Sequence, residues 1–293
     1  MIASFSPNVV SFAIVLFCML HSLIGAPAVA TENGKLKIIA LAPHIVELLY
    51  DIEAQDQIIA TSTFADYPRE AKNIPRVGDH SRLQIEKIIQ LQPDIILAWQ
   101  GGSPADDLER LKAYGLRIEY SAPKQLVDVA ADLRWLGKLV DKQTKANQLA
   151  EDYLARLKSV ETRYAQKQKI STFFEVWSSP LQTVSANAWP NQQLALCGAQ
   201  NIFADLPQDY PSVSLEQVLT NKPKIIIQPR TKAGTHHTGF AWSKYGFIPA
   251  VEHEFLLHPD SDKVYRMTRR MIDELESLCA QIDVARKYYD HSK

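Results

Sequence analysis

The stretch "LQIEKIIQLQPDIILAW" (83–99) and its counterpart "VSLEQVLTNKPKIIIQP" (213–229) decide the predicted fold. In each, an acidic residue lies three or four positions into a short helix, a loop with proline follows, and an apolar strand ends the stretch. Glu86 and Glu216 therefore occupy equivalent places. We interpret the repeat as pseudo-twofold architecture, in which two related lobes face each other across a cleft.

Strand-like and helical patterns alternate on both sides of these stretches. Strands are predicted at 37–42, 57–62, 94–99 and 117–122, with helices at 44–52, 83–92 and 105–115 between them. Further along, strands at 171–177 and 224–229 accompany helices at 191–198 and 214–220. Such alternation is typical of a mostly parallel sheet with helices on both faces. The sequence therefore predicts an α/β protein with two Rossmann-like lobes.

A long helix is predicted between the lobes. No Gly or Pro interrupts residues 138–169, and the apolar positions there recur near a 3.6-residue period. A helix of about 25 residues would be about 35–40 Å long. The predicted organisation is an N-terminal lobe (31–140), a linking backbone helix (141–169) and a C-terminal lobe (170–293), whose end (264–289) is again helical.

Residues 1–30 are predicted to form a cleaved signal peptide. Val9–Leu20 is an uncharged apolar run, too short to span a bilayer comfortably, and Ala28 and Ala30 offer a small-residue cleavage site. No Lys or Arg precedes the run, so an uncleaved membrane anchor is the alternative. Cys18 lacks the small residues that a lipoprotein signal has before its cysteine. We expect a periplasmic protein without a lipid anchor.

The mature chain of 293 − 30 = 263 residues keeps the net charge of −1, because residues 1–30 carry no charged side chain. Without a basic block, nucleic acid is not an expected partner. Cys197 and Cys279 are an even pair in an oxidising compartment, which favours a disulfide closing a loop of about 80 residues. Two buried free thiols are the alternative.

Motifs of catalysis and metal binding are missing from the sequence. There is no G-x-S-x-G, H-E-x-x-H, G-x-x-x-x-G-K-[ST] or G-x-G-x-x-G pattern in a suitable context. His236 and His237 lie in a polar loop without nearby Cys or acidic partners, which is typical of a surface. We expect a protein that is not an enzyme and has no resident metal or cofactor.

Aromatic rings gather in the loops that follow strands or precede the two repeated helices. In parallel sheets these loops lie at the carboxyl edge, where ligands bind. Ordinary core residues are the alternative for any one ring. As a set, they predict flat surfaces that sandwich a large, mostly apolar ligand. The rings are Phe64, Tyr67, His80, Trp99, Trp177 and Tyr210.

Six segments together resemble a known family. They are "APHIVELLY", "TSTFADYPREA", "GDHSRLQIEKIIQLQPDIILAWQGG", "CGAQNIFAD", "YPSVSLEQVL" and "DKVYRMTRR". The chain is similar to the periplasmic cobalamin (vitamin B12)-binding proteins of ABC importers, which belong to the class of substrate-binding proteins with a helical backbone. The resemblance covers nearly the whole mature chain, and the order and spacing of the segments are more specific than any one of them.

The resemblance implies a corrinoid held between the lobes by aromatic side chains. The matching positions are Phe64, His80, Trp99 and Tyr210, together with residues 174–177. Asp262 and Arg266 match an Asp and an Arg that make polar contacts with the amide fringe of the corrin. From the residues alone, such a pair four positions apart would be an ordinary surface ion pair.

The resemblance also implies partners. Glu86 and Glu216 match acidic residues, one on each lobe, that dock on arginines of the membrane permease. The partners would be the permease and ATPase of an ABC transporter at the inner membrane, and we expect a monomer. From the residues alone, each Glu would be a solvated helix residue.

Two positions depart from the family pattern. His80 and Tyr210 stand where members can carry Trp, so the ring area for stacking is smaller, and a neutral imidazole is also a common metal ligand. A role of His80 at a cobalt therefore stays open. Iron-siderophore or haem binding within the same architecture, and a periplasmic enzyme that uses the cleft, are the alternatives.

Overall fold

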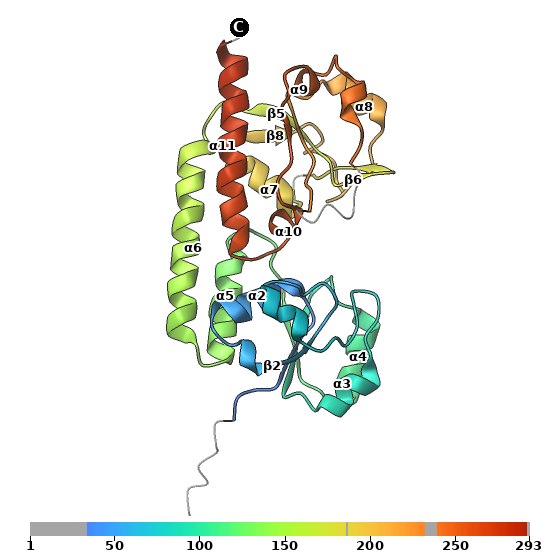
Figure 1. The fold of residues 1–293 in the computed structure, drawn as a ribbon, viewed down its shortest axis with the longest axis vertical. Coiled ribbons are helices and arrows are strands. Elements are labelled where there is room, and N and C mark those ends of the chain that lie inside the picture. The colour runs from blue at the N-terminus through green and yellow to red at the C-terminus, as the bar shows by residue number, and fades with distance from the viewer. Residues whose placement is uncertain (1–33, 186, 232–238, 292–293) are drawn as a thin grey trace, which may run out of the picture. The chain divides into compact units, whose positions relative to one another are not determined.

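The repeated stretches end in corresponding strands of two parallel sheets in the computed structural model, which describes residues 34–185, 187–231 and 239–291 (Figure 1). The first sheet has the order β2-β1-β3-β4 and the second the order β10-β9-β5-β8. When the strands of each sheet are numbered in chain order and the second sheet is read from β8 to β10, both orders are second, first, third, fourth. The two lobes, which we define by these sheets, therefore share one topology, as the repeat predicts.

Both sheets consist of short strands whose neighbours are parallel. Runs such as "III" in β9 are buried on both faces, as expected where helices cover both sides of a sheet. The strands of the first sheet are β1 (Ile38–Ala40), β2 (Ile58–Thr61), β3 (Ile95–Trp99) and β4 (Ile118–Ser121). Those of the second are β5 (Ile170–Phe174), β8 (Ala199–Asn201), β9 (Ile225–Ile227) and β10 (Leu256–Leu257). An antiparallel ribbon joins β6 (Trp177–Ser178) and β7 (Leu181–Gln182).

Helices connect the strands in both lobes. In the first lobe they are α2 (Pro43–Asp51), α3 (Ile85–Leu91) and α4 (Ala105–Ala113), with 3-10 helices η1 (Gln55–Gln57) and η2 (Arg69–Asn73). In the second lobe they are α7 (Trp189–Leu196), α8 (Leu215–Asn221), α9 (Pro249–Glu252), α10 (Ser261–Val264) and α11 (Arg270–His291), with the 3-10 helix η3 (Trp242–Lys244).

The repeated helices α3 and α8 also end in the same way. Gln92 and Lys222 adopt the left-handed conformation after the last turn, with φ of 46° and 43°. Proline follows in both cases and prevents the helix from continuing. Each chain segment then enters the third strand of its sheet. The repeat is therefore a repeat of backbone geometry as well as of sequence.

Between the lobes the chain forms α5 (Asp128–Leu139) and α6 (Gln143–Tyr164), the latter with 22 residues. Helix α11 lies beside α6 (Figure 1). Arg156 of α6 donates to Asp273 and Glu276 of α11, at 2.7 and 2.8 Å. A pair of long helices, rather than α6 alone, thus forms the backbone of the fold.

The C-terminal prediction of one helix over 264–289 is wrong in one respect. The structure has the short helix α10 and the long helix α11, and residues 265–269 between them are not helical. This break carries Arg266, which donates to Glu47 and Asp66 of the first lobe. Apolar periodicity does not reveal such a break, because it reflects neighbours a few positions away, whereas Glu47 lies 219 residues from Arg266 in the chain.

A disulfide joins Cys197 and Cys279, with Cα atoms 4.6 Å apart. It links the end of α7 to the middle of α11, and both cysteines are fully buried. Among the residues with described positions, no helix is both long enough and apolar enough to cross a membrane. The predicted signal peptide, 1–30, lies outside the described residues.

Candidate functional site

The predicted aromatic residues lie where the strands end. Phe64 and Tyr67 follow β2, Trp177 follows β5, and Tyr210 lies in the segment after β8. Their exposed fractions are 64%, 43%, 42% and 46%, so none of the four is a core residue. Because the strands are parallel, these rings belong to the carboxyl edges of the two sheets, where α/β folds bind ligands.

Trp99, the last residue of β3, is half-buried. Its ring meets the ring of His44 edge-on, with centroids 5.6 Å apart. Gly102 lies directly against the indole, so that any Cβ at that position would collide with it. Trp99 is therefore held on two sides by groups that fix the direction of its ring.

A buried polar chain runs behind Trp99. His44 Nε2 lies 2.8 Å from Ser121 Oγ, which donates to Asp132 Oδ2 at 2.6 Å. Burial lowers the pKa of His44 to about 3, and burial raises the pKa of Asp132 to about 6 against the opposing bond from Ser121. The hydroxyl of Ser121 has one proton, which it donates to Asp132, so it can only accept from His44. His44 therefore carries its proton on Nε2 and donates to Ser121. The chain orients a neutral imidazole, and no base faces the hydroxyl as in a hydrolase triad.

The Asp262 and Arg266 pair belongs to a larger ionic cluster. The two side chains are 3.5 Å apart, but Arg266 lies closer to Glu47 (2.8 Å) and to Asp66 (2.7 Å). The side chain of Arg266 is 14% exposed, which does not fit the alternative of a solvated surface pair. Burial opposes its charge, yet the hydrogen bonds that Arg266 donates to Glu47 and Asp66 raise its pKa overall.

Tyr67 stacks against a second arginine of this cluster. The guanidinium carbon of Arg270 lies 3.4 Å from the centroid of the Tyr67 ring. Arg270 also donates to both oxygens of Glu47, at 2.8 and 2.7 Å. The start of α11 is thereby joined to the ring-bearing loop after β2.

Tyr210 borders a cavity of about 740 Å³ that residues from both lobes line. On one side is the segment after β4, with Lys124, and on the other are Trp189 and Tyr210. Gln192 of α7 joins the two sides, because its amide donates to Lys124 O at 2.8 Å. Volumes of this size are typical of small-molecule sites.

Electrostatics of this cavity favour neutral, hydrogen-bonding phenols. Burial, followed by the nearby Asp209, raises the pKa of Tyr210, while the backbone N–H of Trp189 opposes the shift. Burial also raises the pKa of Tyr265, which does not line the cavity and whose ring packs edge-on against Phe174 with centroids 6.2 Å apart. Both hydroxyls therefore stay protonated at neutral pH.

Residues 174–177 divide their tasks. Glu175 is buried and accepts hydrogen bonds from Trp242 Nε1 at 2.6 Å and from the backbone N–H of Phe240 at 2.8 Å. Trp177 is exposed, and its indole N–H donates to Ser179 O at 2.8 Å. Glu175 thus holds Phe240 and Trp242 in place, and Trp177 presents its ring outward.

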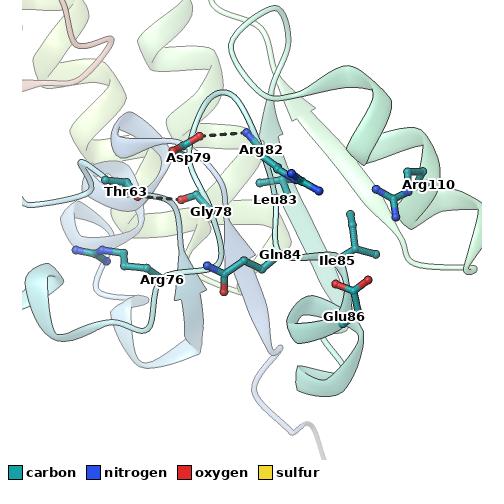
Figure 2. A pocket seen from close by; sticks show the side chains of 10 residues that line it. All are labelled: Thr63, Arg76, Gly78, Asp79, Arg82, Leu83, Gln84, Ile85, Glu86 and Arg110. Atoms are coloured by element: carbon teal, nitrogen blue, oxygen red, sulfur yellow. Dashed lines mark hydrogen bonds between the residues drawn. The ribbon is translucent and has the colours of Figure 1, made fainter.

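The two predicted docking residues are exposed and equivalent in position, each being the second residue of its helix. Figure 2 shows Glu86 at the start of α3, beside a cavity of about 450 Å³ that Arg82 and Arg110 also line. The backbone N–H of Glu216 itself, followed by Ser214, lowers the pKa of the Glu216 carboxyl. Both side chains lie at helix N-termini, where the helix dipole favours a negative charge.

The structure brings some of the predicted residues together and leaves others apart. Phe64 and Asp262 contact Arg266, and Tyr67 is linked to them through Arg270, which shares Glu47 with Arg266. His80 is exposed and lines a different hollow, together with Ser81, Arg82 and the start of α4. Among the described residues, no group of three or more His, Cys, Asp or Glu could hold a metal ion. His236 and His237 lie outside those residues.

Four residues of the candidate site were not predicted from the sequence. Trp189 lies just before the predicted helix 191–198, and Tyr265 lies within the predicted helix 264–289. Glu47 did leave a signal, since a charge in the middle of the apolar "HIVELLY" needs a buried partner. Its partner Arg270 left none, because the arginines of "MTRRM" look alike in sequence.

Comparisons with known proteins agree with this fold. A family model described as periplasmic binding protein matches residues 38–235. The chain is 31% identical over 270 residues to a vitamin B12-binding protein of Vibrio campbellii, covering 92% of this chain and 98% of that relative. It is similar to the crystal structure of the vitamin B12-binding protein BtuF of Vibrio cholerae, with a TM-score of 0.78, 33% identity, and coverage of 86% and 98%. A haem-binding protein of Roseiflexus shares the fold, with a TM-score of 0.75 at 20% identity and coverage of 86% and 99%.

Proposed function

Since the chain belongs to the periplasmic binding protein family, we propose that it captures cobalamin or a related corrinoid and delivers it to an ABC transporter. One observation carries the proposal: exposed rings stand at the carboxyl edges of both sheets, and a cavity lined from both lobes lies beside Tyr210. A corrin is a large, flat ring system with a polar fringe. Stacked aromatic rings match its face, and polar side chains match its edge.

The residues divide into two groups by their role. Phe64, Tyr67, Trp99, Trp177 and Tyr210 contact the faces of the ligand, whereas His80, Asp262 and Arg266 supply polar groups around it. Glu86 and Glu216, one on each lobe, dock on the transporter permease, and the cognate ATPase drives import. The chain is exported with a cleaved signal peptide, acts as a monomer, and binds its ligand without chemical turnover.

The haem and siderophore alternative has less support. Haem-binding proteins share this fold at 20% and 16% identity, and likeness at that level concerns the fold alone. Relatives in Vibrio campbellii and Yersinia pestis that are similar in sequence over nearly their whole length are vitamin B12-binding proteins.

Calorimetric titration of the purified mature protein with cyanocobalamin, cobinamide and haemin tests the function. We expect one-to-one binding of a corrinoid, with little ordering cost because the rings are already held in place. Absence of heat with both corrinoids, in protein shown to be folded, together with binding of haemin, would contradict the proposal.

Phe64→Ala tests whether the ring-bearing loop contacts the ligand. We expect weaker corrinoid binding by about 1–3 kcal/mol and little change in stability, since the ring is exposed in the free protein. Tyr114→Ala is a matched control, because Tyr114 is equally exposed, at 64%, but follows α4 and precedes β4 at the opposite edge of the same sheet. Equal affinity of the two variants would remove Phe64 from the site.

A further inference from the structure

We propose that Glu47 is a positioning residue, which holds the loop 63–67 in its ligand-ready shape by fixing Arg266 and Arg270. This inference rests on the proposed corrinoid site, to which Phe64 and Tyr67 belong. Glu47 itself does not touch the ligand in this scheme, because its side chain is 2% exposed.

The first support is the geometry of Glu47. One oxygen accepts from Arg266 Nη1 at 2.8 Å and from Arg270 Nη2 at 2.7 Å, and the other accepts from Arg270 Nε at 2.8 Å. A buried carboxylate with three charge-assisted bonds fixes both guanidinium groups in direction as well as in place. The bonds span 219 and 223 residues of sequence, and they join α2 of the first lobe to the segment that begins α11.

The second support is what the two arginines do next. Arg266 Nη2 donates to Asp66 Oδ1 at 2.7 Å and reaches the backbone oxygen of Phe64 at 3.4 Å. Arg270 stacks on the ring of Tyr67. The two cations therefore contact Phe64, Asp66 and Tyr67, three of the five residues of the loop.

The third support is the backbone of the loop. Phe64 has a φ of 70°, a left-handed conformation that a bulky residue adopts only when its surroundings impose it. Neighbouring bonds hold the loop from the other side, because Thr63 N donates to Gly78 O at 2.8 Å and Arg76 donates to Ala65 O at 2.8 Å. The arginine contacts complete this clamp on the side of α11.

The charges of the cluster explain why Glu47 is needed. Arg266 and Arg270 are 14% and 17% exposed, so their charges are mostly removed from water. Asp66 and Asp262 are 44% and 46% exposed, so water screens them and they compensate the positive charge of the arginines less than the buried Glu47 does. Without the charge of Glu47, the two guanidinium groups would repel each other and turn towards solvent, and the loop would lose its contacts with them.

Glu47→Gln tests the inference, because it keeps the shape and removes the charge. In the ligand-free protein we expect faster amide hydrogen exchange in peptides covering 62–68, and in titrations with cyanocobalamin about tenfold weaker binding. Asp283→Asn is the matched control. Asp283 is also a buried carboxylate held by cations, here Lys167, Arg286 and Lys287, but it lies about 20 Å further along α11. The Asp283→Asn variant is expected to have a lower melting temperature, with unchanged amide exchange in the loop 63–67 and unchanged corrinoid affinity.

Two results would overturn the inference. One is unchanged loop exchange and unchanged corrinoid affinity in Glu47→Gln, and the other is an equally large increase in loop exchange in Asp283→Asn. If Glu47→Gln does not fold, Asp66→Asn decides, since this half-exposed partner of Arg266 can be changed without opening the core. If the wild-type protein binds no corrinoid, the proposed function fails separately, while the exchange experiment still reports whether Glu47 holds the loop.

Discussion

At the scale of single residues, burial changes the protonation of groups that the sequence shows only as letters. His44 and Asp132 both lie in the polar chain behind Trp99, and their pKa values move in opposite directions. The folded state binds fewer protons at His44 than the unfolded state between pH 6.5 and about 3. It binds more protons at Asp132 between pH 3.8 and about 6.

The stability that His44 contributes is therefore complete above pH 6.5 and is lost as the pH falls towards 3, whereas the contribution of Asp132 is lost as the pH rises through 6. The shift at His44 is the larger one. In His44→Gln, whose amide can still donate to Ser121, the free energy of unfolding should fall less between pH 6.5 and 4 than in the wild type. Urea unfolding at pH 7, 6, 5 and 4 measures this.

Asp132→Asn is the partner experiment for His44→Gln. It removes the opposing contribution, so stability should fall more steeply on acidification than in the wild type. Parallel pH curves for His44→Gln and the wild type would show that His44 does not control the acid sensitivity.

The site residues differ in how visible they are in the sequence. The rings after strands were predictable, because strand ends can be located from apolar runs and parallel strands share a carboxyl edge. The environment of Arg266 was not predictable, because its partners Glu47 and Asp66 lie 219 and 200 residues away in the chain. The position of His80, in a hollow apart from the loop 63–67, depends on how the segment before α3 packs against α4.

At the scale of elements, the disulfide fixes α7 to α11. Arg286 Nη2 donates to Cys197 O at 2.7 Å, so the end of α7 is also held by a hydrogen bond from α11. The bridge spans a sequence separation of 82 residues. Closing a loop of that length mainly restricts the unfolded chain.

The Cys197→Ser, Cys279→Ser double variant should therefore be less stable by about 2–4 kcal/mol. Denaturant unfolding under non-reducing conditions measures the difference. Reduced wild-type protein should resemble the variant, and insensitivity of the wild type to a reducing agent would contradict the bridge.

Helix α11 shows the limit of periodicity at this scale. The apolar stripe of the C-terminal segment predicts a helix, and α11 confirms it from Arg270 onward. The stripe does not predict the break at 265–269, where Arg266 makes its closest contacts with Glu47 and Asp66 of the first lobe.

At the scale of the whole molecule, the two lobes repeat one topology and each carries an exposed Glu at the second position of the repeated helix. A transporter that contacts both acids would bind only when both lobes are correctly placed. Electrostatic contacts at the rim of an interface act on association and orientation. The docking proposal thus concerns the molecule as a whole rather than either lobe.

The Glu86→Ala, Glu216→Ala double variant should reduce transporter-dependent corrinoid uptake to background and leave corrinoid affinity unchanged. Uptake by cells that lack the native binding protein, together with titration of the purified variant, measures both effects. Glu151→Ala with Glu252→Ala, which removes two exposed acids elsewhere, is the control. Weaker corrinoid binding in the first variant, or normal uptake, would contradict a docking role.

The sequence by itself determined the α/β class, the repeated lobes, the helical link and the strand ends that carry aromatic rings. These features follow from local periodicity and from turn residues, which act over a few neighbouring positions. Only the tertiary structure decided which charges meet, which imidazole loses its proton, and where α11 begins. Those outcomes depend on burial and on contacts between distant segments, and the pattern along the chain contains no direct measure of either.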